Sequence, residues 1–184
     1  MCGHTRPRPV RRRGKNPVPG EPHDHALGRS RGGWGSKIHL LTDGGGLPLA
    51  VEVSAGQAHE SRFFEPLLDA VRIVQPCGPA RRRPERLAGD RGYSFPHIRA
   101  WLRAHRIKAV IPERSDQIRR HHGHPCRLDT ERYRQRNVVE RCIGALKEAR
   151  RLATRYEKLA VHYLGVLKLA MIIQLMSVGL SNTP

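Results

Sequence analysis

The fold of this chain is decided by residues 37–54, which read KIHLLTDGGGLPLAVEVS. Two apolar runs flank a turn that begins Asp43-Gly44. An Asp-Gly pair between such runs is a strong short-range signal for a β-hairpin. The sequence therefore predicts antiparallel strands over residues 37–42 and 47–54, joined by a tight turn.

Outward from this hairpin, the apolar pattern predicts alternating helices and strands. Short apolar runs that end at Gly89 and Pro112 indicate two further strands, over residues 86–89 and 108–111. Spacings of three and four indicate further helices, the second of them capped by Ser94, over 59–74, 94–105, 131–154 and 159–178. Residues 113–130 are charged and irregular. This order predicts a mixed α/β layer fold.

The charge of the chain points to its partner. The 184 residues carry a formal net charge of +18, with a sequence pI near 11.2. With 38% apolar residues the chain can bury a core, so it is not wholly disordered. A charge this large repels itself unless an anion lies nearby, and nucleic acid is the commonest such partner. An arginine-rich but otherwise ordinary soluble protein remains the alternative.

Cysteine usage and hydropathy predict a cytoplasmic protein. The chain opens with no apolar signal core, and its cysteines, which form no CxxC pair, are Cys2, Cys77, Cys126 and Cys142. Residues 159–180 are strongly apolar, but His162, Lys168 and Gln174 interrupt them. A membrane span would bury these side chains in lipid, so the pattern predicts a buried helix in a soluble core and no membrane partner.

The first 26 residues differ from the remainder. They are rich in Arg, Pro and Gly and show no hydrophobic period. We expect residues 1–26 to form a disordered basic lead-in. The folded domain is then expected over residues 27–180.

Asp90 is the first candidate for chemistry. It follows the strand predicted over 86–89, and α/β folds place their sites at the carboxyl ends of strands. An Asp in this position is also often a turn or cap residue. The position alone does not separate a functional Asp90 from a structural one.

A second set of candidates lies on the helix predicted over 131–154. Tyr133, Arg136, Glu140 and Lys147 fall within about 60° of one helical face at roughly 100° per residue. The opposite face is apolar and predicts the core side. One face thus carries an acid, two cations and a phenol, although a solvated salt-bridge face has the same pattern.

The spacing Tyr-x2-Arg-x3-Glu-x6-Lys resembles the signature of DDE transposases of bacterial insertion sequences, the insertion sequence four/five-like superfamily. Neighbouring segments resemble that family too, and they are residues 28–33, 36–39, 56–60, 89–93 and 153–158. The likeness covers about residues 22–178.

The resemblance implies a ribonuclease H-like mixed sheet flanked by helices. It also implies two Mg²⁺ ions held by three carboxylates, which promote phosphoryl transfer on double-stranded DNA at transposon ends and target. Asp90 would be the second carboxylate and Glu140 the third. Arg136 and Lys147 would hold DNA phosphates, with Tyr133 beside the strand being cut.

The chain departs from the family at its first acid, which lies on the family's first strand. Asp24 and Asp43 are the candidates to replace it, but the first lies in an irregular lead-in and the second in the hairpin turn. Codons for residues 1 to about 15, read in a shifted frame, permit nearly all of the family's segment after that acid. We therefore expect residues 1–15 to be an out-of-frame reading and the domain to be N-terminally truncated.

The expected consequence is a sheet without its first, central strand. Such a chain would be marginally stable or prone to aggregation, because two strands would lose partners. It would also be inactive in metal-dependent strand transfer, because the first Asp is missing. It could still form a homo-oligomer or associate with an intact transposase.

Lesser motifs have simpler explanations. A zinc site is conceivable in a short cluster, although a polar loop explains it better, at His121, His122, His124 and Cys126. The glycine-rich segment over 32–37 lacks the ending of a phosphate loop, and His59-Glu60 lacks the second His of a zinc protease. Three function classes remain: a transposase remnant, a non-catalytic basic DNA-binding protein and a ribonuclease H-like nuclease.

Overall fold

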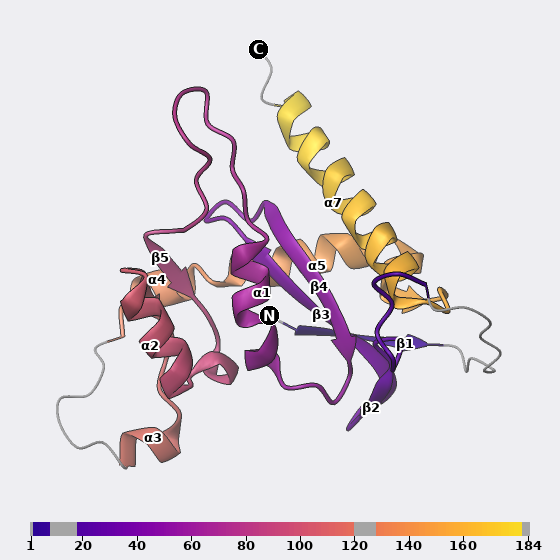
Figure 1. The fold of residues 1–184 in the computed structure, drawn as a ribbon, viewed down its shortest axis with the longest axis horizontal. Coiled ribbons are helices and arrows are strands. Elements are labelled where there is room, and N and C mark those ends of the chain that lie inside the picture. The colour runs from indigo at the N-terminus through magenta and orange to yellow at the C-terminus, as the bar shows by residue number, and fades with distance from the viewer. Residues whose placement is uncertain (1, 8–17, 120–127, 182–184) are drawn as a thin grey trace.

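The computed structural model of the 184-residue chain describes residues 2–7, 18–119 and 128–181. Figure 1 shows the arrangement of its elements. The strands are β1 (Cys2–Pro7), β2 (Gly28–Ser30), β3 (Gly33–Thr42), β4 (Pro48–Ala55), β5 (Arg86–Ala88), β6 (Lys108–Val110) and β7 (Thr154–Arg155). The helices are η1 (Glu60–Phe63), α1 (Phe64–Asp69), η2 (Arg91–Tyr93), α2 (Pro96–Ala104), α3 (Ser115–Arg119), α4 (Thr130–Arg134), α5 (Asn137–Glu148), α6 (Arg150–Ala153) and α7 (Ala160–Ser181).

The predicted hairpin is confirmed as β3 and β4. Ser36 pairs with Ala55 and the ladder runs to Leu41 and Ala50, with a register shift before Thr42. The turn closes because the Asp43 carboxylate accepts hydrogen bonds from two backbone N–H groups ahead of it. Strand β3 also begins earlier than predicted, because its first residues pair with β2.

The position beside β3 is occupied by β1. Strand β1 pairs antiparallel with Ser36 to His39 of β3 and parallel with β7, so it lies inside the sheet. The expectation that residues 1–26 are all disordered is therefore wrong for residues 2–7, and the expectation of an absent first strand is wrong for the part of β3 that β1 covers. Backbone hydrogen bonding to two neighbours orders this segment despite its composition.

The β3 strand extends beyond β1. Its register with β1 ends at His39, whereas its register with β4 continues to Thr42. On the β1 side, Leu40 to Thr42 have no strand partner among the described residues. Strands β5 and β6 form a separate parallel pair instead of joining this edge.

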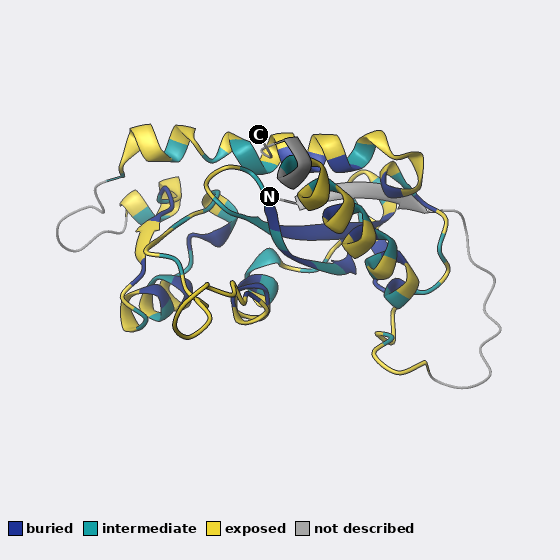
Figure 2. Ribbon diagram, turned by 90° about the horizontal axis from the view of Figure 1, so that it is seen from above, coloured by how far each residue is buried: buried dark blue, intermediate teal, exposed yellow. Residues whose placement is uncertain are grey.

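Apolar clusters hold these sheets, and Figure 2 shows buried segments at the centre of the molecule. The larger core packs α5 and α7 against β3 and β4, with Leu146, Tyr163 and Leu167 almost fully buried. The second joins α1, α2 and the β5–β6 pair through Phe64, Ile98 and Leu102. The mixed α/β architecture is consistent with a ribonuclease H-like domain.

Several predicted boundaries differ from the structure. The helix predicted over 59–74 is shorter, as η1 and α1, and Phe95 rather than Ser94 occupies the N-cap of α2, because Pro96 starts that helix. Ser94 instead donates to the side chain of Gln117, in a segment predicted to be irregular. The helix predicted over 131–154 is divided into α4, α5 and α6.

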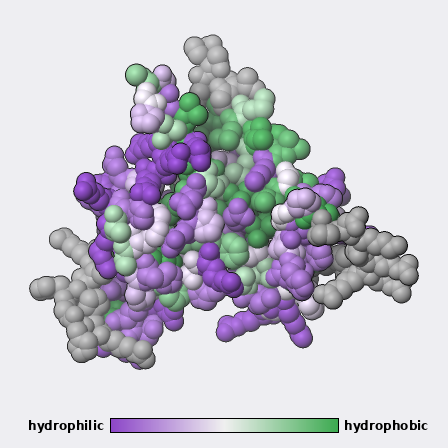
Figure 3. Space-filling model, viewed as in Figure 1, coloured by the Kyte–Doolittle hydropathy of each residue, from purple (hydrophilic) through white to green (hydrophobic). Residues whose placement is uncertain are grey.

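Helix α7 matches the predicted helix in position but not in burial. Only its first half packs into the core, and Figure 3 shows apolar surface over its outer part. Its exposed apolar side chains are Leu169, Ile172, Ile173, Leu175 and Met176. The helix is long and apolar enough to cross a membrane, a test that a core helix of a soluble protein also passes.

A buried arginine ties the N-terminal segment to α7. Arg155 is 1% exposed, and its guanidinium donates to Ser36 Oγ at 2.5 Å and to the Ala26 carbonyl at 3.3 Å. It also lies over the Tyr163 ring, 5.3 Å from its centre. We call these four residues the Arg155 cluster. Because it holds Ala26, the expectation of disorder is also wrong for the residues just before the domain.

Glu21 strengthens the same attachment. Its two carboxylate oxygens accept from the backbone N–H groups of Ala160 and Val161 at 2.8 and 2.9 Å. These N–H groups begin α7 and have no partner within the helix. A residue from the supposed lead-in therefore caps the C-terminal helix, a contact that only the folded chain can make.

Candidate functional site

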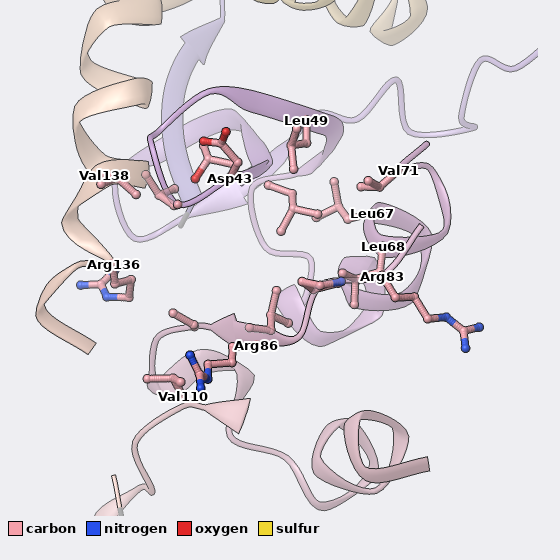
Figure 4. A pocket seen from close by; sticks show the side chains of 18 of the residues that line it. Asp43, Leu49, Leu67, Leu68, Val71, Arg83, Arg86, Val110, Arg136 and Val138 are labelled. Atoms are coloured by element: carbon pink, nitrogen blue, oxygen red, sulfur yellow. The ribbon is translucent and has the colours of Figure 1, made fainter. Parts of the chain in front are cut away.

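A cavity of about 550 Å³ lies between the end of β3, helix α1, strand β5 and the start of α5. Figure 4 shows its walls: Asp43 and Val138 on one side, the apolar side chains of α1 on another, and Arg86 and Val110 from the β5–β6 pair. Asp90 and Arg136 also line it. We call it the strand groove, because it runs along the uncovered part of β3.

Asp90 lies where the sequence places it, directly after β5. Its Oδ1 accepts from the backbone N–H of Gly92 at 2.8 Å and so caps the short helix η2. The side chain is half-buried and faces the strand groove. The structural interpretation of Asp90 as a cap residue is thus confirmed, and its other carboxylate oxygen has no hydrogen bond among the described residues.

Three of the four predicted helix residues come together. Arg136 donates to Glu140 Oε1 at 2.9 Å, and its guanidinium lies 5.4 Å from the centre of the Tyr133 ring. Tyr133 belongs to α4, but the intervening turn residues keep right-handed helical dihedral angles, so the neighbours stay adjacent. Lys147 lies in the last turn of α5 and does not line the strand groove.

Arg136 is incompletely satisfied. Its Nε is buried and has no hydrogen-bond partner among the described residues. Buried donors are normally paired, and an unpaired one in a native structure calls for an explanation. An anion in the groove would supply the missing acceptor, which suits a guanidinium that meets phosphate.

The two candidates for a replacement first acid are both held in turns. The Asp43 carboxylate accepts from Gly45 and Leu47, and the Asp24 carboxylate accepts from the N–H of Ala26 at 2.9 Å. Each side chain therefore has the local role that the sequence indicates. Asp43 lines the strand groove, whereas Asp24 does not.

The structure brings a further acid, Glu60, next to Asp90. A Cβ added to Gly92 would lie less than 3.0 Å from carboxylate oxygens of both residues, so the two acids flank the same glycine. Lys37 Nζ, 3.3 Å from Glu60 Oε1, offsets part of this charge. The sequence indicated only a helix start at Glu60. Its proximity to Asp90 depends on how η1 and η2 pack together, which residue spacing does not encode.

The described residues do not form the metal centre that the resemblance implies. No three His, Cys, Asp or Glu side chains gather among them. Asp90 caps η2, and Glu140 is bound to Arg136. This donor set does not fit two divalent ions, which need more carboxylate charge than Asp90 and Glu140 provide.

A second cavity, of about 580 Å³, opens on the other side of the Asp90 loop. Its cationic and aromatic lining comprises Lys37, His59, Arg91, Phe95 and Arg114. Two acids also line it: Glu60 pairs with Lys37, and Asp116 pairs with Arg114. Phe95 packs edge-on against His59, with ring centres 4.9 Å apart, and Arg114 lies over its ring. We call this cavity the basic groove. The zinc site weighed at His121, His122, His124 and Cys126 falls outside the described residues.

The fold, the strand-end acid and the α5 face define a class of protein, and comparison with known families agrees. Residues 12–175 match the model of the transposase DDE domain family. The chain therefore belongs to the transposase DDE domain family.

Individual relatives narrow the likeness to insertion sequences. The chain is 35% identical over 136 residues to the “Putative transposase for insertion sequence element IS402” of Burkholderia cepacia, over 73% of this chain and 60% of that protein. It is 26% identical over 135 residues to the “Putative transposase for insertion sequence element IS6501” of Brucella ovis, over 73% of this chain and 93% of that protein. No solved structure matches.

Proposed function

We propose that this chain is the catalytic domain of an insertion-sequence transposase that acts on double-stranded DNA at transposon ends and target. Asp90 and Glu140 are two of the three metal-binding carboxylates that such a domain needs. The observation that carries this proposal is the strand groove, which Asp90 and Arg136 line together, with Glu140 held 2.9 Å from Arg136. Asp90 thus lies in the groove itself, and Glu140, which does not line it, is connected to it through Arg136.

The basic residues beside the groove suit a phosphodiester. Arg136 has an unpaired buried Nε among the described residues, and a guanidinium can hold phosphate through two donors at once. Lys147 would meet the DNA backbone farther along α5, as a point charge. Tyr133, under the Arg136 guanidinium, keeps that side chain at the groove. With a third acid in place, Asp90 and Glu140 could hold Mg²⁺, which would supply Lewis-acid chemistry.

We further propose that the chain lacks its first acid and is inactive by itself. Two features support this: Leu40 to Thr42 have a free edge among the described residues, and the strand groove runs along it. Continuing the β1 register beyond Cys2 would lay three residues along that edge, beside β5. A strand there would join both sheets and could bring an acid to Asp90. The out-of-frame origin proposed for residues 1–15 agrees with this view.

A gain-of-function experiment tests the proposal. The chain should bind transposon-end duplex but not cleave it with Mg²⁺. Fusing a six-residue β-strand with one Asp ahead of Met1, in the β1 register, should raise its melting temperature and give Mg²⁺-dependent nicking. Asp90→Asn or Glu140→Gln in the fused chain should abolish nicking and leave duplex affinity within about threefold. The control variants Asp69→Asn and Glu148→Gln, at exposed positions, should retain nicking activity.

Each outcome of that experiment bears on one part of the proposal. Nicking by the unfused chain would contradict the proposal that the chain lacks its first acid and is inactive by itself. Nicking by the fused chain that survives Asp90→Asn would overturn the assignment of the site. Duplex binding with no nicking in any fused variant would favour the second candidate, a non-catalytic DNA-binding protein, which the net charge of +18 already supports.

A further inference from the structure

The hairpin of β2 and β3 presents an exposed aromatic side chain with arginines around it. Trp34 is 63% exposed, and Arg29 stands directly opposite it in the antiparallel register. Arg31, also exposed, lies in the two-residue turn. Directly opposed residues of a hairpin share a face, so the indole and the Arg29 guanidinium form one surface.

This orientation is imposed by the other face of the hairpin. A Cβ on Gly28 would collide with the Gln57 side chain, and one on Gly56 would meet the carbonyls of Gly28 and Gly35 at 3.0 and 3.1 Å. The glycine-lined face is therefore packed closely against the segment after β4. Since side chains alternate along a strand, Arg29 and Trp34 must face solvent.

The second tryptophan of the chain shows what a structural indole looks like here. Trp101 stacks on His105 at 3.8 Å and meets Phe64 edge-on at 5.5 Å. Trp34 has no ring contact among the described residues. Arg29 and Arg31 likewise have no carboxylate partner in that part of the chain. Ring packing thus accounts for Trp101. Neither ring packing nor ion pairing accounts for the exposed hairpin surface of Trp34, Arg29 and Arg31.

The hairpin surface lies on the other face of the sheet from the basic groove. Lys37 and Gln57 line that groove, and Gln57 packs against the glycine-lined face of the hairpin. Trp34 lies instead on the same face as Ser36, whose hydroxyl meets Arg155, because side chains alternate along a strand. Trp34, Arg29 and Arg31 therefore form an aromatic and basic site of their own.

We propose that the hairpin surface binds an unpaired DNA strand, with a base stacked on Trp34 and phosphates held by Arg29 and Arg31. The proposal rests on the proposed function, because it supposes that the chain acts on DNA. An aromatic face flanked by cations is what an unpaired strand requires, since each nucleotide offers a flat base beside a phosphate. Bases within a duplex are already stacked and cannot cover Trp34.

Fluorescence of the full chain tests this directly, in EDTA and without cleavage. A twelve-residue oligothymidylate should quench tryptophan emission in Trp101→Phe, where Trp34 alone emits, but not in Trp34→Phe. By anisotropy, Trp34→Leu should weaken oligothymidylate binding about tenfold, and Trp34→Phe should weaken it less. The affinity of either variant for a blunt duplex of equal length should change less than twofold.

Arginine variants complete the design. Arg29→Gln and Arg31→Gln should each weaken binding of the oligonucleotide and lower its salt dependence, while Arg103→Gln, on the outer surface of α2, should do neither. Unchanged oligothymidylate affinity in Trp34→Leu would overturn the proposal, as would equal losses for single strand and duplex. Because no metal or cleavage enters the measurement, a failure here is distinct from a failure of the proposed catalysis.

Discussion

Two arginines in the C-terminal third of the chain are used in opposite ways. Arg155 is almost completely buried, and each of its three nitrogens donates to a carbonyl or a hydroxyl. Arg136 is half-buried, holds one carboxylate and leaves its Nε without an acceptor among the described residues. A satisfied buried arginine stabilises the fold, whereas an unsatisfied one at a groove remains available to a ligand.

The largest effect is expected from breaking the Arg155 cluster. Arg155→Met would leave Ser36 Oγ and several carbonyls without their donor, so the free energy of unfolding should fall by about 3–5 kcal/mol. Urea denaturation followed by circular dichroism measures it. Arg150→Met, which removes an exposed arginine of the neighbouring helix α6, should cost less than about 1 kcal/mol. Equal losses for the two variants would contradict a special role for Arg155.

A second test concerns His39, which lies on the same strand as Ser36. Its side chain is fully buried, stacks on Phe63 and contacts Ser54 Oγ at 2.8 Å. Burial, helped by the charge of Lys37, lowers the pKa of His39 to about 4.

The sign of the resulting pH dependence follows from linkage. The unfolded chain protonates His39 near pH 6.5, before the folded chain does, so the stability present above that pH is lost as the pH falls toward 4. The loss should be roughly 2 kcal/mol between pH 6.5 and pH 5. Denaturation of His39→Gln over the same range should show a clearly smaller slope, and an equal slope would remove His39 as the cause.

A smaller effect is expected from the cap that accompanies the Arg155 cluster. Glu21→Gln should lower the free energy of unfolding by about 1 kcal/mol, because the start of α7 loses a charged acceptor. Although burial alone would raise the pKa of Glu21, the N–H groups of Val161 and Ala160, together with His25, lower it overall.

That lowered pKa gives the cap its own pH dependence. The contribution of Glu21 is present above the ordinary carboxyl pKa and is lost as the pH falls through the lowered one. The difference in thermal stability between wild type and Glu21→Gln should therefore shrink in acid. Glu65→Gln, at an exposed position on α1, should match wild type throughout; a difference that persists at low pH would count against the cap.

The smallest effect on stability is expected at Arg136 in the strand groove. This variant sharpens the contrast between Arg136 and the buried Arg155. Arg136→Gln should change the free energy of unfolding by less than about 0.5 kcal/mol, because the pair with Glu140 is partly exposed. Duplex affinity should nevertheless fall severalfold, with a lower salt slope. Without metal, Glu140→Gln should bind duplex more tightly than wild type, since it releases Arg136 and removes a negative charge.

The outcome at the site shows which inferences a sequence supports. The position of Asp90 after a strand was predicted correctly because a strand end and a following turn are local features. The proximity of Tyr133, Arg136 and Glu140 was predicted correctly because helical spacing carries across the turn between α4 and α5. Glu60 was missed, since it meets Asp90 only through the crossing of two short helices, and no spacing encodes that contact.

The fold likewise has parts that the sequence predicts and parts that depend on long-range contacts. The β3–β4 hairpin, the strand after Pro84 and the position of α7 follow from turn residues and apolar periodicity, which act over a few neighbours. The ordering of residues 2–7 and of the segment around Glu21 does not, because composition there indicates disorder. Their partners, β3 and the first N–H groups of α7, lie far away in the sequence.

By itself, then, the sequence determined the hairpin, the succession of helices and strands, the positive charge and the resemblance to the transposase family. Each of these depends on nearby residues or on composition. Only the tertiary structure decided that a strand lies beside β3, that its coverage ends at His39 and that Asp90 and Arg136 share a groove. Those are long-range contacts, selected by the burial of distant surfaces and the pairing of distant backbone groups.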